Sequence, residues 1–421
     1  MAQSNHEPRQ DEQTGRQVVP PVSFRDIEDA QATVEPVLRV TPVTHSHSLS
    51  ALAGREVLLK GEHCQRTGSF KIRGARNFVA RLESAESPRQ VVAASAGNHA
   101  QGVALAARLS GLRATIFMPI NAALPKVEAT RSYGATVVLE GAVVDDAMAA
   151  ARAHAARVGA VLVPPFDHPL VVAGQGTLGL ELAQQAAEAE AVVVPVGGGG
   201  LLAGVATALA HTRPRVKVIG VEAAGAAAMR SSLDAGRCVT LDSVTTMADG
   251  IAVRCVSELT LAHAQAYVDD VVTVSEEEIS QALLLLVERA KAVVEPAGAV
   301  GLAAILAGRV PGRGAALAVL SGGNVDPLVL TKLIDHGLSA AGRYLLLRIV
   351  LSDKPGALAA LTDAVARMRL NVLSVEHHRA GLDLGVDEVE VLVTLETRDP
   401  SHRHEVVAAL REQGFNVGLV G

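Results

Sequence analysis

The sequence predicts an α/β protein with a two-lobed core, followed by a separate domain of βαββαβ order. Its 421 residues correspond to about three domains of roughly 150 residues each. Hydrophobic residues make up 49% and charged residues 19%, a balance typical of chains that fold around apolar cores. Short apolar runs alternate with helical stretches over residues 21–330, whereas residues 344–421 follow a different pattern.

The core consists of apolar strands, each followed by a helix. Near-continuous apolar strands are typical of parallel strands that are buried on both faces. Since over 300 residues exceed what one sheet commonly carries, we expect two α/β lobes with a cleft between them. The predicted strand and helix pairs are 91–94 with 99–109, 114–118 with 126–133, and 136–139 with 145–158, and further strands are predicted at 191–196, 217–221 and 316–320.

After the core, a helix from Pro327 and a small-residue joint at 339–342 lead into the last domain, with residues 331–343 as the linker. Four apolar residues from 389 to 395 alternate strictly, as a half-exposed antiparallel strand should. The element order is the ferredoxin-like one. The predicted elements are a strand at 344–351, a turn at 352–356, a helix through Leu358, Leu361, Val365 and Met368, strands at 373–379 and 389–395, a helix at 403–413 and a strand at 415–420.

Charge and cysteine usage exclude several classes of protein. The net charge is −6 and no basic run is present, which argues against a nucleic-acid partner. Cys64, Cys238 and Cys255 lack the spacing of a zinc or disulfide framework and suit a reducing compartment. Residues 1–20 are predicted to be a disordered polar tail without a signal sequence, so we expect a cytoplasmic protein.

One stretch, residues 191–210, carries no charge and is long enough for a membrane-spanning helix. Pro195 and four consecutive glycines, Gly197, Gly198, Gly199 and Gly200, interrupt it, so no membrane span is expected.

The glycine run is the first candidate binding site. It follows a predicted strand and opens a helix, so its N–H groups and the helix dipole predict an anion site suited to a phosphate. Gly198, Gly200 and Ala203 satisfy a dinucleotide-binding pattern, with Glu222 at the distance expected of the ribose-binding acid. Another phosphorylated cofactor and a plain tight turn remain alternatives.

A second candidate is Lys71, which follows Phe70 in a block of glycine and hydroxyl residues. A lysine in that setting can form a Schiff base with a pyridoxal phosphate aldehyde. The alternative is a solvated lysine at a helix start.

At this point the sequence resembles the fold-type-II pyridoxal phosphate enzymes, which have a tryptophan synthase β-like core, and among them the threonine dehydratases (threonine ammonia-lyases). The resemblance covers about residues 20–330. Five blocks in order carry it: residues 67–71 (TGSFK), 95–102 (SAGNHAQG), 197–201 (GGGGL), 295–298 (EPAG) and 321–324 (SGGN).

The resemblance implies a role for each matching residue. Lys71 would form the Schiff base and Phe70 would lie against the cofactor ring, while Asn98 would bond the ring hydroxyl. The cofactor phosphate would contact Gly197, Gly198, Gly199, Gly200 and Leu201, the ring would lie beside Gly250, and the pyridine nitrogen would contact Ser321. The substrate carboxylate would contact Ser95, Ala96, Gly97, Asn98 and His99.

Simpler interpretations accompany these roles. Ser95, Asn98 and His99 could cap the helix that follows them. Glu295 could pair with Lys291 one helical turn earlier. The dipeptide at 249–250 could be an ordinary Asp-Gly turn.

At two positions the sequence differs from related serine racemases, and these differences narrow the choice of enzyme. Related serine racemases carry a serine as second acid/base where Ala96 stands, so racemisation is expected to be poor. Those relatives also bind a divalent cation near Glu222, but Ala228 replaces the second acid, so no metal is predicted.

The C-terminal domain resembles an ACT domain, an amino-acid-sensing module. Ser352 or Asp353 is predicted to cap its first helix, with Pro355 in the first turn. The resemblance implies an amino-acid effector at Asp353, Pro355, Gly356 and Asn371, between paired domains of a homodimer or homotetramer.

The sequence therefore predicts a pyridoxal phosphate-dependent enzyme that converts L-threonine to 2-oxobutanoate and ammonia, in isoleucine synthesis or threonine breakdown, with L-serine as a poorer substrate. The alternatives are a serine dehydratase or racemase, a nicotinamide-dependent dehydrogenase and a non-catalytic amino-acid sensor.

Overall fold

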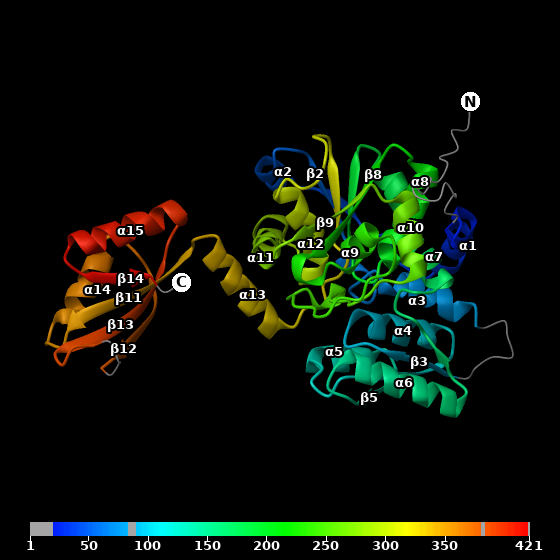
Figure 1. Cartoon of the computed structure of the whole chain (residues 1–421), viewed down its shortest axis with the longest axis horizontal. Coiled ribbons are helices and arrows are strands. Elements are labelled where there is room, and N and C mark those ends of the chain that lie inside the picture. The colour runs from blue at the N-terminus through cyan, green and yellow to red at the C-terminus, as the bar shows by residue number, and fades with distance from the viewer. Residues whose placement is uncertain (1–19, 83–89, 380–383, 420–421) are drawn as a thin grey trace. The chain divides into compact units, whose positions relative to one another are not determined.

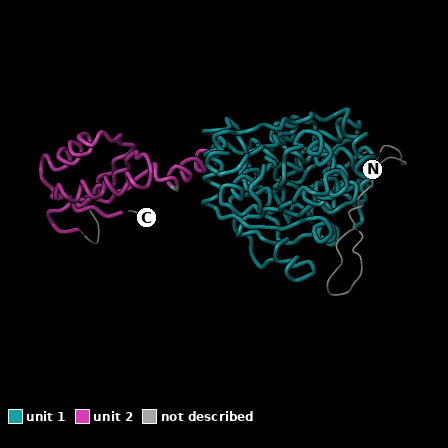
Figure 2. Tube along the Cα trace, turned by 90° about the horizontal axis from the view of Figure 1, so that it is seen from above, with its two compact units in different colours: residues 1–330 teal, residues 331–421 magenta. Residues whose placement is uncertain are grey.

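The computed structural model describes residues 20–82, 90–379 and 384–419. Contacts divide the chain into two compact units, Met1–Leu330 and Thr331–Gly421, which are described separately (Figure 2). The predicted polar tail lies outside the described residues except for Pro20, which is buried.

The large lobe of the first unit is built on a six-stranded sheet of order β1-β2-β10-β7-β8-β9 (Figure 1). Every neighbouring pair in it is parallel except β1 with β2, as the apolar strands predicted. The strands are β1 Val43–His45, β2 Val57–Lys60, β7 Ala191–Pro195, β8 Lys217–Ala223, β9 Asp270–Val274 and β10 Ala316–Val319. The α-helices associated with this lobe are α1 Phe24–Val34, α2 His47–Ala53, α7 Pro169–Gln185, α8 Gly200–Thr212, α9 Ala228–Ala235, α10 Glu258–Tyr267, α11 Glu276–Leu285 and α12 Pro296–Leu306. Its short 3-10 helices are η1 Glu62–Cys64, η2 Ala224–Ala226 and η3 Asp249–Ile251, and η4 Leu286–Ala290 is a π-helix.

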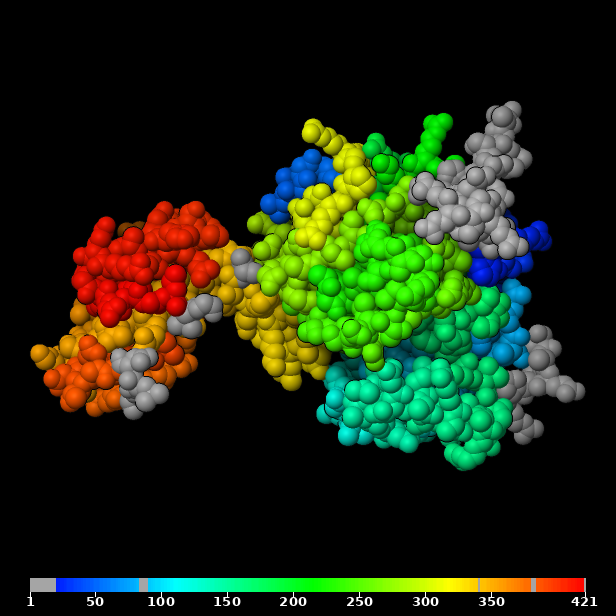
Figure 3. All heavy atoms as spheres, in the orientation of Figure 1, coloured from blue at the N-terminus to red at the C-terminus, as the bar shows by residue number. Residues whose placement is uncertain are grey.

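The small lobe has a four-stranded parallel sheet of order β5-β4-β3-β6. Alternate residues of β3 enter different cores: Val91 and Ala93 pack with α3 and α4, whereas Val92 and Ala94 pack with α6. In the space-filling view the small lobe is a separate mass beside the large lobe (Figure 3). Its elements are α3 Lys71–Ala80, β3 Gln90–Ala94, α4 Asn98–Leu109, β4 Arg113–Met118, α5 Leu124–Ser132, β5 Thr136–Leu139, α6 Val144–Val158 and β6 Val161–Leu162.

The charge-free stretch 191–210 divides into β7 and α8, as its proline and glycines predicted. Among the described residues, none of the helices combines the length and apolar character that a membrane crossing requires.

The second unit has the predicted βαββαβ order, with an antiparallel sheet of order β12-β13-β11-β14. The helix before it is longer than predicted: α13 continues through the first part of the expected joint, and the chain turns at Gly342, whose φ is +70°. The elements are α13 Pro327–Ala340, β11 Tyr344–Ser352, α14 Ala357–Arg367, β12 Val372–His378, β13 Glu388–Glu396, α15 Pro400–Glu412 and β14 Asn416–Leu419.

The predicted cap of α14 is wrong. Its N-cap is Gly356, at φ +93° and without a side-chain hydrogen bond, so Ser352 and Asp353 lie outside the helix and Pro355 precedes its first turn. A cap at φ near +90° favours glycine, which has no Cβ to clash with the backbone.

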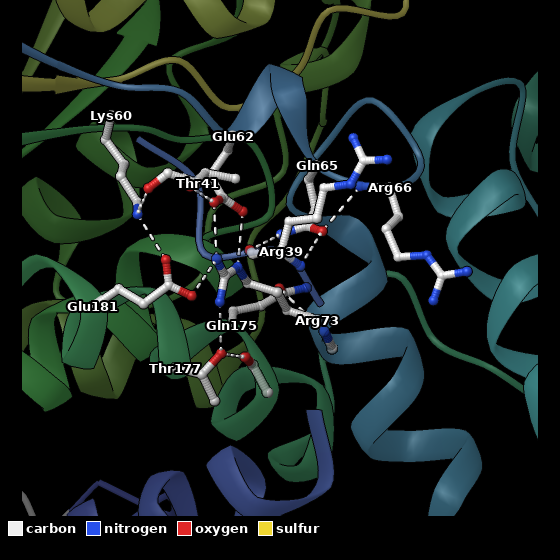
Figure 4. Close-up of polar contacts among 12 residues, drawn as sticks. Arg39, Thr41, Lys60, Glu62, Gln65, Arg66, Arg73, Gln175, Thr177 and Glu181 are labelled. Atoms are coloured by element: carbon white, nitrogen blue, oxygen red, sulfur yellow. Dashed lines mark hydrogen bonds and ion pairs between the residues drawn. The ribbon is translucent and has the colours of Figure 1, made fainter. Parts of the chain in front are cut away.

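A buried cluster of two cations and two carboxylates joins β2, η1, α3 and α7 (Figure 4). Arg73 donates to both oxygens of Glu62, at 2.8 and 2.9 Å, and to Glu181 at 2.8 Å. Lys60 donates to the other Glu181 oxygen at 2.7 Å. Burial opposes the charged form of Glu62, yet the guanidinium beside it lowers the pKa of this carboxyl below its ordinary value. The cluster therefore holds the first turns of α3 against the large lobe.

Removing Arg73 should strongly destabilise the first unit, because two buried carboxylates would then face one cation. We expect Arg73→Met to lower the free energy of unfolding by about 3–5 kcal/mol, measured by urea unfolding of the full chain. Arg230→Met is the matched control, because the ion pair of Arg230 with Asp234 reaches solvent. Arg230→Met should lower the free energy of unfolding much less than Arg73→Met does. Equal decreases in the two variants would contradict a stabilising role for the cluster.

Candidate active site

The site lies where loops that follow the strands of both sheets meet the loop before α3. The N–H of Phe70 donates to the carbonyl of Ser321 at 3.0 Å, and the N–H of Gly323 donates to the carbonyl of Gly68 at 2.8 Å. Carboxyl ends of parallel strands are the usual place for ligands in α/β sheets. Two of the predicted blocks, 67–71 and 321–324, are thus bonded directly to each other.

Lys71 is the first residue of α3, and its side chain has an unusual setting. Its Nζ donates to the carbonyl of Pro165 at 3.1 Å and lies 5.2 Å from the centre of the Phe70 ring. Burial lowers the pKa of Lys71 to about 8, against the attraction of Glu295. A lysine with this pKa is neutral, and hence nucleophilic, far more often near neutral pH than a solvated lysine.

The glycine run forms the start of α8. Gly199 is its N-cap at φ +87°, and no side chain of the described residues caps the helix. A Cβ on Gly198 would lie 2.3 Å from the ring of Phe166, so that ring covers this glycine. The uncapped N–H groups and the helix dipole suit an anion. Leu201 lies behind them in the core of the large lobe.

Phe166 and Pro165 belong to the segment before α7, and sequence reasoning missed both. Pro165 contributes only its carbonyl, which any residue possesses, and Phe166 lies against Gly198 and Gly200. The only signal was an aromatic residue beside two prolines in a loop after an apolar strand.

The loop before α4 does not use its polar side chains as caps. The N-cap is Gly97, and the N–H of Gly97 donates to Ser95 Oγ at 3.2 Å. Asn98 instead donates to Glu295 at 2.6 Å, and His99 makes a 3.0 Å bond through Nε2 to the carbonyl of Val163. Burial and nearby Lys71 lower the pKa of His99 to about 3, so the ring is neutral. The capping interpretation is therefore wrong.

A cation from the small lobe faces this loop. A Cβ on Gly97 would lie 3.8 Å from Lys126 Nζ, which pairs with Asp249 of the large lobe at 2.7 Å. The neighbouring Ala96 carries no group that could donate or accept a proton. The loop thus combines a helix N-terminus with a nearby positive charge, a setting that suits a carboxylate.

Glu295 is a buried acid at the N-cap of α12. Burial raises the pKa of Glu295 to about 7, and the carboxylate of Asp249 adds to the rise. The alternative in which Glu295 pairs with Lys291 is wrong: Lys291 precedes α12 at φ +56°, and its Nζ donates to the carbonyl of Glu288. Gly250 packs against the start of α12, since a Cβ there would lie 2.9 Å from that of Ala297.

The Glu222 carboxylate accepts hydrogen bonds from the first N–H groups of α9. Its two oxygens accept the N–H groups of Met229 and Arg230 at 2.7 and 2.9 Å. Burial raises the pKa of Glu222 to about 7 despite these bonds. Because Glu222 is fully buried and each of its oxygens already accepts a hydrogen bond, this carboxylate is poorly placed to bind the ribose of a dinucleotide. Within the described ranges there is no group of three His, Cys, Asp or Glu residues that could hold a metal ion.

The candidate effector residues lie at opposite ends of the sheet in the second unit. Asp353 follows β11, and its N–H donates to the carbonyl of Asp387 at 2.7 Å, next to Pro355 and Gly356. Asn371 bonds Glu396, which pairs with the first residue of β11. A single domain therefore brings Asp353, Pro355 and Gly356 together but leaves Asn371 apart.

Comparisons with known proteins agree with this architecture. Residues 34–322 match the family described as pyridoxal-phosphate dependent enzyme, and residues 345–415 match the ACT domain. An L-threonine ammonia-lyase of Thermotoga maritima is 46% identical over 401 residues, which cover 95% of this chain and all of that protein.

Solved structures of similar proteins also cover most of this chain. The processed form of threonine deaminase isoform 2 from Solanum lycopersicum is 39% identical, with a TM-score of 0.71 over 74% of this chain and 92% of that one. Maize serine racemase is 36% identical, with a TM-score of 0.71 over 76% of this chain and 98% of that one. The match over residues 34–322, together with these identities, shows that the chain belongs to the pyridoxal-phosphate dependent enzyme family.

Proposed function

We propose that this protein is an L-threonine ammonia-lyase that uses pyridoxal phosphate to convert L-threonine to 2-oxobutanoate and ammonia. The observation that carries the proposal is Lys71, a lysine of lowered pKa where the candidate cofactor loops meet. The name of the Thermotoga maritima relative, which matches nearly the whole chain, supports the choice of substrate.

The residues present fit the cofactor. Its aldehyde requires a neutral amine, which Lys71 offers, and its phosphate requires an anion site, which the start of α8 offers. In the described structure the hydroxyls of Thr67 and Ser69 are buried without a partner. Buried polar groups without partners are costly, so these two are suited to a polar ligand. Ser321 and Phe70 are held side by side by the bond between their main chains.

When bound, pyridoxal phosphate supplies an electron-withdrawing ring that makes the substrate's Cα–H acidic. We infer that the substrate's amine would take the place of Lys71 at the cofactor, and that the freed, neutral Lys71 would then take the Cα proton as general base. The first N–H groups of α4 and the charge of Lys126 would hold the substrate carboxylate. The proton taken from Cα and the departing β-hydroxyl together make one water, and one water is consumed in the hydrolysis that yields 2-oxobutanoate and ammonia. Because Ala96 offers no second base, elimination is favoured over racemisation.

The competing interpretations are less well supported. A dehydrogenase would need Glu222 for a ribose, but both oxygens of that carboxylate bond the start of α9. A pure amino-acid sensor would have no use for a lysine of lowered pKa beside an anion site.

The amine of Lys71 can be tested directly. Lys71→Ala should lower L-threonine turnover by at least about 10²- to 10⁴-fold, the range for a removed acid or base, with 2-oxobutanoate formation as the measurement. Lys217→Ala, at the exposed start of β8, is the matched control and should retain turnover. Near-native activity of the Lys71 variant would overturn the assignment.

We also propose that the ACT domain binds an amino-acid effector in a homo-oligomer. Deleting residues 344–421 should preserve turnover and abolish its response to added amino acids, because every candidate cofactor residue lies in the first unit. The assay compares turnover with each branched-chain amino acid. A truncated enzyme that still responds would place the effector site outside the ACT domain.

Point variants of the full chain show which end of the domain holds the effector. Since Asp353 and Asn371 lie at opposite ends of one sheet, loss of the response in both Asp353→Ala and Asn371→Ala would indicate a site shared by two domains. Loss in only one variant would place the site at that end of a single domain.

A further inference from the structure

Three side chains extend from a main-chain carbonyl into the candidate active site as one row of hydrogen bonds, which we call the Asn98 network. Asn324 Nδ2 donates to the carbonyl oxygen of Thr67 at 2.7 Å and to Asn98 Oδ1 at 2.8 Å. Asn98 Nδ2 then donates to Glu295 Oε1 at 2.6 Å. The row joins segments more than 200 residues apart in sequence.

The carbonyl of Thr67 sets the direction of every bond in this network. A carbonyl oxygen can only accept, so the Asn324 atom that faces it must be the amide nitrogen. The same nitrogen faces Asn98, which must therefore present its oxygen there. Asn98 consequently turns its own nitrogen toward Glu295, where a carboxyl oxygen accepts in either protonation state. The orientation of the Asn98 amide is thus fixed from the Thr67 end through Asn324, and Glu295 accepts the hydrogen bond that this orientation directs toward it.

The fold makes room for this network with two glycines. Gly68 has φ +69°, and a Cβ on it would lie 2.3 Å from Asn324 Oδ1. A Cβ on Gly322 would lie 2.3 Å from Glu295 Oε1 and 3.1 Å from Asn98 Nδ2. The N–H of Glu295 also donates to the carbonyl of Gly322 at 3.0 Å, which holds the acid beside Asn98. Both ends of the network are therefore part of the loops that surround Lys71.

We propose that Asn324 and Glu295 are positioning residues that lock the Asn98 amide with its second N–H available to donate to an oxygen of the bound cofactor. This inference rests on the proposed function. An amide turned the other way would present its carbonyl oxygen, which repels an electron-rich cofactor oxygen instead of stabilising it. Neither Asn324 nor Glu295 needs to touch the cofactor for this effect.

Asn324→Asp tests one end of the network, because it replaces the donor by an acceptor of nearly the same shape. We expect the dissociation constant for pyridoxal phosphate to rise about tenfold, the size of one lost hydrogen bond, and the absorption spectrum of the bound cofactor to change. Asn77→Asp is the matched control, since Asn77 is also buried and bonds the carbonyl of Leu170 outside the network. It should change stability without changing the spectrum.

A conservative and a disruptive variant of Glu295 test the other end of the Asn98 network. Glu295→Gln retains an oxygen that can accept from Asn98 and should keep a near-native spectrum and cofactor affinity. Glu295→Met removes the acceptor and should change both, as Asn324→Asp does. Equal behaviour of the Gln and Met variants would overturn the proposed orientation, and this pair remains informative if Asn324→Asp does not fold.

A double-variant comparison separates action through Asn98 from a general structural effect. In an Asn98→Ala background, Asn324→Asp should cause no further change in cofactor affinity or spectrum. An undiminished effect there would overturn the inference. Failure of the native chain to bind pyridoxal phosphate would instead overturn the proposed function, so the two failures are distinguishable.

Discussion

The pairing of Arg73 with Glu62 and Glu181 is the interaction on which the candidate site depends. Arg73 lies two residues after Lys71 on α3, so whatever fixes Arg73 also fixes the start of that helix. Both carboxylates come from the large lobe, one from the turn after β2 and one from α7. Since a buried charge without a partner is costly, all these elements must assemble together, which makes the position of the Lys71 amine a property of the whole first unit.

Desolvation explains the chemistry around this amine. The same exclusion of water lowers the pKa of Lys71 to about 8 and raises that of Glu295 to about 7. Each shift moves a group toward its neutral form, and pairs of groups with shifted pKa values are typical of active sites. The Asn98 network runs from Glu295 to the loop that precedes Lys71, so the same loops set the direction of these hydrogen bonds and the proton affinities of Lys71 and Glu295.

The sequence predicted the architecture well, because strand and helix patterns are local. Strands β3, β4, β5, β7, β8 and β10 and the βαββαβ order of the last domain follow from apolar runs and alternation, and glycines interrupt residues 191–210 as expected. Strands β1, β2, β6 and β9 were not predicted. The partners of polar side chains could not be predicted in this way. Asn98 resembled a helix cap by position, yet it bonds Glu295 and Asn324, which are distant in sequence. Gly356 rather than Asp353 caps α14 because the turn adopts a positive φ.

Borohydride reduction of the holoenzyme followed by peptide mass mapping shows which lysine bonds the cofactor, and Lys71 is the residue expected to do so. Reduction makes the link between a lysine and the pyridoxyl group permanent, so the modified lysine can be identified. We expect one pyridoxyl group per chain, on the peptide that contains Lys71. Modification of another lysine, such as Lys126 or Lys60, or the absence of any pyridoxyl group would contradict it.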